Sequence, residues 1–278
     1  MLQLKSRQQL NDFLPTENVG FVPTMGALHE GHSSLIRRAR QENSCVIVSI
    51  FVNPLQFNDV DDLAKYPQSM VDDINLLTKL KVDAVYLPRF ADIYPEGKDI
   101  QMLSGGAASL TFEGEARPGH FDGMLTVVQR LISQVRPQRA YFGEKDAQQL
   151  CLVRKLFLEN DLKCEIVACA IVRDDKGLAL SSRNARLSNS ARCHALALSK
   201  ALAAAQTSYN GGEKHVASIL GAMQKHLSHP EIKVVYSAIV DDQSFVELKS
   251  VVNAPSRVII AAVIDGVHLL DNVLLHTN

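Results

Sequence analysis

Residues 45–52 form an almost continuous apolar run in which β-branched side chains predominate. A strand with one face in water alternates polar and apolar residues, whereas a strand covered on both faces is apolar at successive positions. The run is also far shorter than the stretch that a membrane-spanning helix requires. It therefore predicts a strand in the interior of a parallel sheet, with a layer of helices on each face.

Further apolar strands alternate with helices along the first part of the chain. The strands are predicted at 19–23, 45–52, 82–87, 139–142 and 164–172, and the helices at 33–41, 72–80, 122–135 and 146–159. The helix at 122–135 is the clearest, because its apolar residues keep helical spacing. The alternation predicts an α/β fold with a doubly wound, mainly parallel sheet.

The pattern changes at the charged turn 173–177. An alanine-rich helix is predicted at 188–206, and a Gly-Gly break at 211–212 separates it from a helix that ends near residue 227. Two strand-like runs follow, at 232–240 and 257–264. We therefore predict two domains: a larger one at 1–174 and a smaller α+β domain at 175–278.

Composition and charge exclude several classes of protein. Of the 278 residues, 46% are hydrophobic and 21% are charged, which is ordinary for a globular protein. Lys and Arg number 29 against 30 Asp and Glu, so the basic surplus of a general nucleic-acid binder is missing. The chain has 5 cysteines without a Cys-x-x-Cys pair, and the polar segment Met1–Asn11 does not resemble a signal peptide. These features predict a cytoplasmic protein with reduced thiols.

The segment His29-Glu30-Gly31-His32 is the first candidate site. It lies between a predicted strand and a predicted helix, where the end of a parallel strand and a helix N-terminus favour an anionic ligand. Two imidazoles three residues apart can donate to one phosphate. Two alternatives stay open: surface histidines in a turn, or a metal site with His120 as third ligand. The metal is disfavoured, because the zinc-protease pattern His-Glu-x-x-His is one residue longer.

Two further polar segments suit a phosphorylated ligand. Within Tyr141–Gln149, Lys145 offers positive charge, and Asp146 offers either a ribose contact or a plain helix cap. Within Leu180–Asn184, two serines and Arg183 suit phosphate oxygens, unless the segment is a solvated turn. The chain contains no P-loop, no dinucleotide-binding glycine motif and no nucleophile elbow.

Two other segments suggest a small polar substrate. Asn53 and Gln56 directly follow the buried strand, and their neutral amides suit a hydroxy acid better than a second phosphate. The segment Arg117–Gly123 precedes the clearest amphipathic helix. It is either a rigid loop beside the site or a helix start capped by Asp122.

Taken in order, these motifs resemble the pantothenate synthetase family, also called pantoate–β-alanine ligases. The likeness extends from about Gly20 to Asn272, and Pro23–His32 matches the family's signature without a change. The His-x-Gly-His core resembles that of the wider nucleotidyltransferase superfamily, which has a second, flexible phosphate-binding motif where Leu180–Asn184 lies. The resemblance implies a Rossmann-like larger domain that binds ATP and pantoate, and a smaller C-terminal lid domain.

The resemblance also implies a two-step reaction. The pantoate carboxylate attacks the α-phosphate of ATP, giving pantoyl adenylate and pyrophosphate, and the β-alanine amine then displaces AMP to form pantothenate for the coenzyme A pathway. Mg²⁺ accompanies ATP, with no tightly bound organic cofactor. The implied partners are these small-molecule substrates and a second copy of the chain in a homodimer, with no nucleic acid and no membrane.

Particular residues receive roles from the resemblance. The implied catalytic residues are His29, His32, Lys145 and Arg183. The implied ATP-binding residues are Met25, Gly26, Ala27, Leu28, His29, Glu30, Gly31, His32, Gly143, Glu144, Lys145, Asp146, Val172, Leu180, Ser181, Ser182 and Arg183. Pantoate is assigned to Asn53, Gln56 and Gln149, β-alanine to Gln56, and magnesium to Asp72 and Asp73.

The chain departs from the family pattern at four places. Leu180 stands where methionine is usual, Gln68 where arginine is common, Arg186 where tyrosine is usual, and His268 where arginine is usual. The last three bear on domain closure rather than on the reaction. Beyond the resemblance, the acidic loop Asn58–Ala64 is predicted to act as a mobile cover that keeps water from the adenylate.

Two other functions are weighed against this one. The first is another nucleotidyltransferase, which would pass an adenylyl or cytidylyl group to a phosphate acceptor. The neutral amides of Asn53, Gln56 and Gln149 argue against it. The second is a catalytically silent nucleotide-binding or RNA-binding module, which would be expected to lack part of the His, Lys and Arg set.

Overall fold

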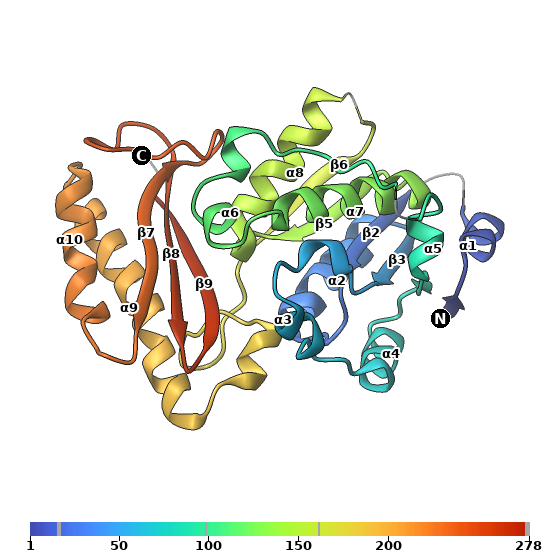
Figure 1. Cartoon of the computed structure of the whole chain (residues 1–278), viewed down its shortest axis with the longest axis horizontal. Helices are drawn as coiled ribbons and strands as arrows, with labels where there is room; N and C mark the ends of the chain where they lie inside the picture. Colours follow the sequence, from blue (N-terminus) through green and yellow to red (C-terminus); the bar gives the residue numbers. More distant parts are fainter. Residues whose placement is uncertain (16–17, 98, 161, 276–278) are drawn as a thin grey trace. The chain divides into compact units, whose positions relative to one another are not determined.

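The computed structural model describes residues 1–15, 18–97, 99–160 and 162–275 (Figure 1). The chain forms two compact units. The first contains Met1–Glu144 and Leu152–Ala170, and the second contains Lys145–Cys151 and Ile171–Asn278. The short segment 145–151 thus belongs to the second unit, although the sequence around it belongs to the first. The domain boundary after residue 174 stays a prediction.

The first unit is built on a six-stranded parallel sheet. Its strands, in spatial order, are β1 (Leu2–Leu4), β4 (Ala84–Tyr86), β3 (Cys45–Ile50), β2 (Val19–Thr24), β5 (Arg139–Gly143) and β6 (Glu165–Cys169). The chain runs outward from β2 through β3 to β4, then returns to the other side of β2 to form β5 and β6. The strand order therefore reverses between β2 and β5, which is where ligands bind in sheets of this kind. The predicted α/β, Rossmann-like sheet is confirmed.

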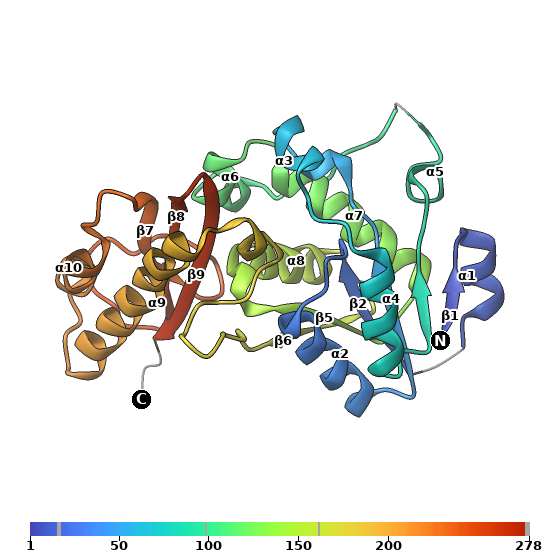
Figure 2. The same ribbon diagram turned by 90° about the horizontal axis from the view of Figure 1, so that it is seen from below.

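Helices cover both faces of this sheet. Figure 2 shows α2 (Glu30–Glu42) and α7 (His120–Val135) on opposite sides of the strands. On the α2 face, buried side chains of α2 and of α4 (Met70–Lys79) pack on alternate residues of the strands. This core contains Val22, Leu35, Ile36, Ala39, Val46, Val48, Ile50, Leu77, Val82, Val85, Tyr141, Val167 and Cys169. Both faces of β3 are buried, as its apolar run predicts.

Several short elements in the first unit escape the sequence patterns. They are α1 (Arg7–Phe13), η1 (Pro54–Gln56), α3 (Val60–Ala64), α5 (Phe90–Ile93), η2 (Ala107–Ser109), α6 (Glu113–Ala116) and η3 (Glu144–Asp146). Elements of this length are too short for a hydrophobic period to identify them. The helix α8 (Ala147–Glu159) follows η3 and corresponds to the helix predicted at 146–159.

The second unit is a small α+β structure, as predicted. Its sheet consists of the antiparallel strands β7 (Lys233–Asp241), β8 (Ser256–Ile264) and β9 (Val267–Leu275), and α9 (Asn189–Asn210) and α10 (Val216–Leu227) cover it (Figure 1). Leu198, Leu202 and Ile219 lie in the core between helices and sheet. The short helix η4 (Ser182–Arg186) precedes α9.

The strand β9 was not predicted, although the sequence contains a hairpin signal. Asp265 and Gly266 join β8 to β9 and both have positive φ, at 54° and 70°. Two positive φ values are the requirement of a two-residue hairpin turn, and Asp-Gly is among the pairs that satisfy it.

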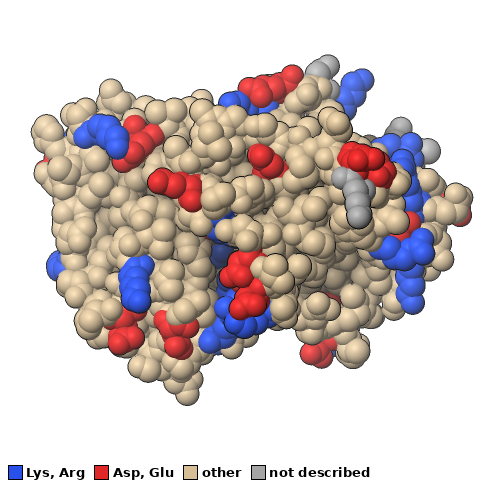
Figure 3. All heavy atoms as spheres, in the orientation of Figure 1, with Lys and Arg blue, Asp and Glu red and all other residues tan. Residues whose placement is uncertain are grey.

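The surface carries charges of both signs, and the cysteines are unpaired with one another. On the face drawn in Figure 3, acidic and basic side chains are interspersed. None of the helices in the described part of the chain is long and apolar enough to cross a membrane. All five cysteines are free thiols, and burial raises the pKa of Cys45 to about 11.

Candidate active site

The signature segment, Pro23–His32, begins in the last residues of β2 and turns into α2. The Thr24 hydroxyl fixes the turn, because it donates to the Ser49 carbonyl at 2.7 Å and accepts the Gly26 N–H at 3.2 Å. Gly26 has a φ of 83°, and a Cβ there would lie 3.0 Å from Asp73 and from Ile50. Glycine is therefore required both by the left-handed backbone and by the lack of space.

The two histidines cap α2 reciprocally. His29 is the N-cap residue, and its Nδ1 accepts the Gly31 N–H at 3.1 Å. In turn, Nδ1 of His32 accepts the His29 N–H at 3.3 Å. The helix thus begins at Glu30, three residues before the predicted start at Ser33. The prediction was wrong because histidine and glycine are not usual first-turn residues, and the cap becomes visible only in the folded loop.

This double cap determines which ring nitrogen carries the proton. Because Nδ1 accepts a hydrogen bond in both His29 and His32, the proton of each neutral imidazole resides on Nε2. The rings lie 4.2 Å apart between centroids. Both imidazoles are therefore hydrogen-bond donors at Nε2, which suits an anion and not a metal ion. Among the described residues, no group of three or more His, Cys, Asp or Glu side chains could hold a metal.

Asp72 and Asp73, predicted as magnesium ligands, lie in the first turn of α4. Asp73 is 2% exposed, and its carboxylate accepts the N–H groups of Ala27 at 2.9 Å and Leu28 at 2.8 Å. Asp72 is exposed. The contacts of Asp73 count against a metal role for it, because its oxygens already serve backbone donors. The magnesium assignment stays a prediction.

Glu30 forms an exposed ion pair on α2. Its carboxylate pairs with the Arg37 guanidinium, and this hydrogen bond is the main cause that holds the pKa of Glu30 below its usual value. Such exposed pairs contribute little to stability, about 0–1 kcal/mol. The pair leaves Glu30 ionised and keeps its charge balanced by Arg37.

Asn53 is a buried residue whose side chain forms hydrogen bonds to three different segments of the first unit. It is 0% exposed, and its amide donates to Gln56 Oε1 at 3.2 Å and to the Gly123 carbonyl at 3.1 Å. Its Oδ1 accepts the Tyr94 hydroxyl at 2.9 Å and caps η1 through the Leu55 N–H. These contacts place Asn53 to hold Gln56, and its assignment to pantoate stays a prediction.

Gln56 is held from three directions and is 7% exposed. Besides its contact with Asn53, Nε2 approaches Met25 Sδ at 3.0 Å, and the backbone carbonyl accepts from His120 Nδ1 at 2.8 Å. These contacts join Gln56 to the signature segment and to α7.

His120 therefore supports the site as a neutral donor. Arg117, which can only donate, lies 3.3 Å from His120 Nε2 and pairs with the buried Glu113 at 3.4 Å. The ring proton accordingly lies on Nδ1 and points at Gln56. Gly119 is the N-cap of α7, with a φ of 79°, so the predicted cap at Asp122 was wrong by three residues. The contact of His120 with Gln56 agrees with the other alternative, a loop beside the site, whereas no local sequence signal marks Tyr94 as a support.

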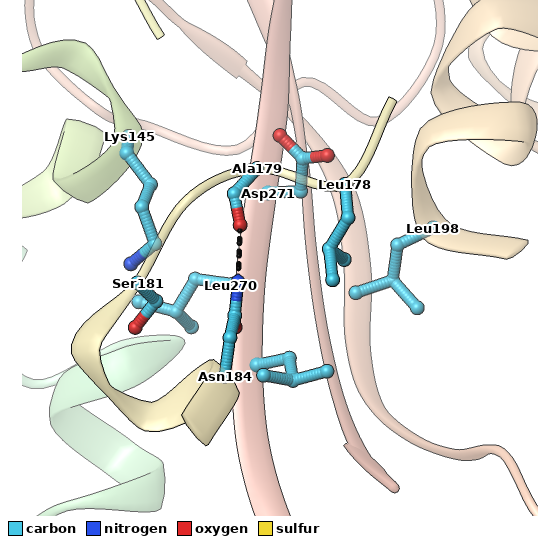
Figure 4. A pocket seen from close by; sticks show the side chains of 9 residues that line it. Lys145, Leu178, Ala179, Ser181, Asn184, Leu198, Leu270 and Asp271 are labelled. Atoms are coloured by element: carbon cyan, nitrogen blue, oxygen red, sulfur yellow. Dashed lines mark hydrogen bonds between the residues drawn. The ribbon is translucent and has the colours of Figure 1, made fainter. Parts of the chain in front are cut away.

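Lys145 belongs to the second unit and is the middle residue of η3. Its ammonium pairs with Asp146 at 3.1 Å, and its backbone carbonyl accepts from Asn272 Nδ2 at 2.9 Å. Figure 4 shows Lys145 lining a small pocket together with Ser181 and Asp271. Asp271 is bonded through both oxygens to Arg173, at 2.6 and 2.8 Å. Two consecutive residues of β9 thus hold the Lys145 segment and the turn at 173–177.

The segment Leu180–Asn184 folds into η4 beside Lys145. Ser181 is its N-cap and accepts the Arg183 N–H at 3.3 Å, while Asn184 Nδ2 donates to the Ala179 carbonyl at 3.0 Å (Figure 4). The Leu180 N–H donates to the Val172 carbonyl at 2.9 Å. The alternative of a plain solvated turn is therefore disfavoured, because the segment is capped and internally hydrogen-bonded.

The predicted site residues divide between the two units. The first unit contains Met25–His32, Asn53, Gln56, Asp72, Asp73, Gly143 and Glu144, and the second contains Lys145, Asp146, Gln149, Val172 and Leu180–Arg183. Within the first unit, the structure brings Gln56 and Asp73 onto the signature segment, where Gln56 contacts Met25. Within the second, it brings Ser181 to the pocket of Lys145.

These features define a class of protein. A parallel sheet of this order, with His-x-Gly-His capping the helix after its first central strand, defines a nucleotidyltransferase-like α/β protein, in which the strand end and the helix N-terminus favour an anionic ligand at the end of β2.

Comparison with known proteins identifies the family. The model of the family described as pantoate-beta-alanine ligase matches residues 3–274. The chain is 45% identical over 269 residues to a bifunctional pantoate ligase/cytidylate kinase of Thermosynechococcus vestitus, covering 96% of this chain and 52% of that longer relative. The chain belongs to the pantoate–β-alanine ligase family.

Solved structures agree with this family assignment. The pantothenate synthetase of Thermus thermophilus is 42% identical, with a TM-score of 0.94 over 98% of this chain and 99% of that one. A pantoate-beta-alanine ligase of Francisella tularensis, complexed with beta-gamma ATP and beta-alanine, is 34% identical, with a TM-score of 0.81 over 100% and 99%. The family resemblance seen in the sequence is confirmed.

Proposed function

We propose that this protein joins pantoate to β-alanine at the expense of ATP, through a pantoyl adenylate, and so makes pantothenate. The family match supports this function, as does the related ligase solved with beta-gamma ATP and beta-alanine. The observation that carries the proposal is the reciprocal cap of His29 and His32 at the start of α2, in which Nδ1 of both rings accepts a backbone N–H, so that the proton of each neutral imidazole lies on Nε2. By the same resemblance, we expect a cytoplasmic homodimer in the coenzyme A pathway.

The first step forms the adenylate. A carboxylate oxygen of pantoate attacks the α-phosphorus of ATP, and the bond from that phosphorus to the bridging oxygen of pyrophosphate breaks. Both reactants are anionic, so the attack requires donors for the negative charge that develops on the phosphate oxygens. His29 and His32 supply two such donors, and Lys145 and Arg183 supply positive charge. Magnesium enters with ATP as part of the substrate and balances phosphate charge.

The second step forms the amide. The amine of β-alanine attacks the acyl carbon, the bond from that carbon to AMP breaks, and the amine loses a proton. The chain forms no covalent bond with either substrate, so the rate depends on position and electrostatics. Gln56 holds pantoate and lies near the amine, while Gln149 makes the second pantoate contact. Asn53 acts through Gln56. The segment Asn58–Ala64, which contains α3, covers the adenylate.

The products of the complete reaction test this function. Incubation with ATP, pantoate and β-alanine is expected to release AMP and pyrophosphate in equal amounts, with pantoate and β-alanine each varied separately. With ATP and pantoate alone, one equivalent of pyrophosphate per site is expected. Release of ADP, or turnover that needs a phosphorylated acceptor instead of pantoate, would mean a different transferase. ATP binding without any product would mean a silent nucleotide-binding protein.

Substitution of Gln56 tests the assignment of the pantoate site. Gln56→Ala is expected to raise the KM for pantoate about tenfold or more, because loss of a hydrogen bond in a buried site costs about 1–3 kcal/mol. The KM for ATP is expected to change less than about twofold. Gln68→Ala is the matched control, since Gln68 is exposed in the same unit. Equal increases in both KM values would contradict the assignment.

A further inference from the structure

Asp73 is a buried acid bonded to the backbone of the signature segment. It is distant from that segment in the sequence, because it lies 46 positions after Ala27 and 45 positions after Leu28. Its Oδ2 accepts the Ala27 N–H, and its Oδ1 accepts both the Leu28 N–H and, at 3.1 Å, the Ser69 hydroxyl. Bonds of this kind to an ionised acceptor are roughly twice as strong as those between neutral groups.

The backbone held by Asp73 adopts an unusual conformation. Gly26 and Ala27 both have positive φ, at 83° and 50°. Alanine rarely adopts the left-handed region, so a compensating interaction is required to hold it there. The two bonds from consecutive N–H groups to one carboxylate supply it. The position of Asp73 in the first turn of α4 also favours its charge.

The same contacts leave the segment with few backbone donors for a ligand. The N–H of Gly26 bonds Thr24, those of Ala27 and Leu28 bond Asp73, and those of His29 and Gly31 bond the imidazoles. All five bonds lie between 2.8 and 3.3 Å. In a P-loop, by contrast, backbone N–H groups cradle the phosphate directly. Here we expect side chains to recognise the anion, and the positions of the His29 and His32 imidazoles depend on the loop that Asp73 holds.

We propose that Asp73 is a positioning residue for adenylate formation. It fixes the left-handed turn at Gly26 and Ala27, and thereby fixes the reciprocal cap through which His29 and His32 present Nε2–H to the phosphate. It acts through this loop and not as a magnesium ligand. The proposal deepens the proposed function and rests on it for the identity of the anion.

Asp73→Asn tests the proposal, with Asp12→Asn as control. Both variants remove one negative charge from a helix of the first unit, but Asp12 is exposed in α1 and has no assigned role. The asparagine side chain in Asp73→Asn retains one carbonyl acceptor and loses the other. The single-turnover rate of pyrophosphate release is expected to fall about 10–100-fold in Asp73→Asn and to change less than about twofold in Asp12→Asn. The magnesium concentration for half-maximal rate is expected to stay the same in both.

Two further measurements separate positioning from other roles. Hydrogen exchange at the Ala27 and Leu28 amides is expected to accelerate at least about tenfold in Asp73→Asn, while the other amides of α4 and β2 keep their protection. Unchanged exchange there would overturn the proposal. A raised magnesium requirement in Asp73→Asn would overturn it too, because a metal ligand would produce that result.

A milder variant covers the case in which Asp73→Asn fails to fold. Ser69→Ala removes only the hydroxyl bonded to Asp73 Oδ1, and we expect a two- to fivefold lower rate with faster exchange at Leu28. No change in either property would overturn the proposal. The hydrogen-exchange results test the contacts between Asp73 and the loop, whatever reaction the protein catalyses. If the wild-type protein forms no AMP and pyrophosphate, the proposed function fails, but the exchange results still decide whether Asp73 holds the loop.

Discussion

Replacement of His29 with asparagine is expected to slow pyrophosphate release in a single turnover by about 10²–10³-fold, with little loss of stability. Asparagine is a favourable N-cap residue, so its side-chain oxygen can accept the Gly31 N–H that His29 Nδ1 accepts now. The asparagine side chain is too short to place a donor where the Nε2–H of His29 lies. Removal of one preorganised donor to developing negative charge typically has an effect of this size.

Two comparisons make this result specific. His29→Ala removes the cap as well as the donor, so it is expected to match the rate loss and to lower stability further, by about 1 kcal/mol. His215→Asn is the matched control, because His215 is the N-cap of α10 and makes no side-chain cap bond in the described part of the chain. It is expected to leave the rate unchanged. Wild-type activity in His29→Asn would show that the role of His29 is structural.

Replacement of Gly123 with alanine is expected to damage both the fold of the first unit and the pantoate site. A Cβ at Gly123 would lie 2.1 Å from the Leu55 carbonyl oxygen and 2.7 Å from the Gln56 nitrogen. Backbone lies on both sides of this contact, so α7 and η1 must separate. Overpacking of this kind typically costs about 1–3 kcal/mol. Separation also breaks the bond from Asn53 to the Gly123 carbonyl.

Urea unfolding and substrate titration measure the two effects of Gly123→Ala. The unfolding midpoint is expected to fall, and the KM for pantoate is expected to rise more than that for ATP, because η1 contains Gln56. Gly221→Ala is the control, since Gly221 lies in α10 and no atom of the described residues lies within 4 Å of its added Cβ. That variant is expected to gain up to about 1 kcal/mol from helix propensity. An unchanged midpoint in Gly123→Ala would contradict the close approach.

The long strands and helices follow from the sequence because hydrophobic period is a local property. The runs at 45–52 and 257–264 became β3 and β8, and the helix predicted at 122–135 became α7 with two more residues at its start. Helix starts were harder to predict. The cap of α2 is made by His29 and that of α7 by Gly119, and neither belongs to the usual capping set of Ser, Thr, Asp and Asn.

The supports of the candidate site could not be predicted from the sequence. The sequence nominates His29, His32, Gln56 and Lys145 as site residues, because these residue types lie at strand ends where ligands bind, and these assignments stay predictions. Asp73 was predicted as a metal ligand, and its bonds to Ala27 and Leu28 depend on how α4 packs against the signature segment. Such contacts join distant parts of the chain, and no local pattern indicates them.

The sequence by itself determined the family and the parallel sheet, since both depend on residue identity and short-range spacing. The tertiary structure decided three other matters. It placed the protons of His29 and His32 on Nε2, it turned Asn53 into a buried support for Gln56, and it gave the segment 145–151 to the second unit. Each results from hydrogen bonds or packing that exist only after the chain has folded.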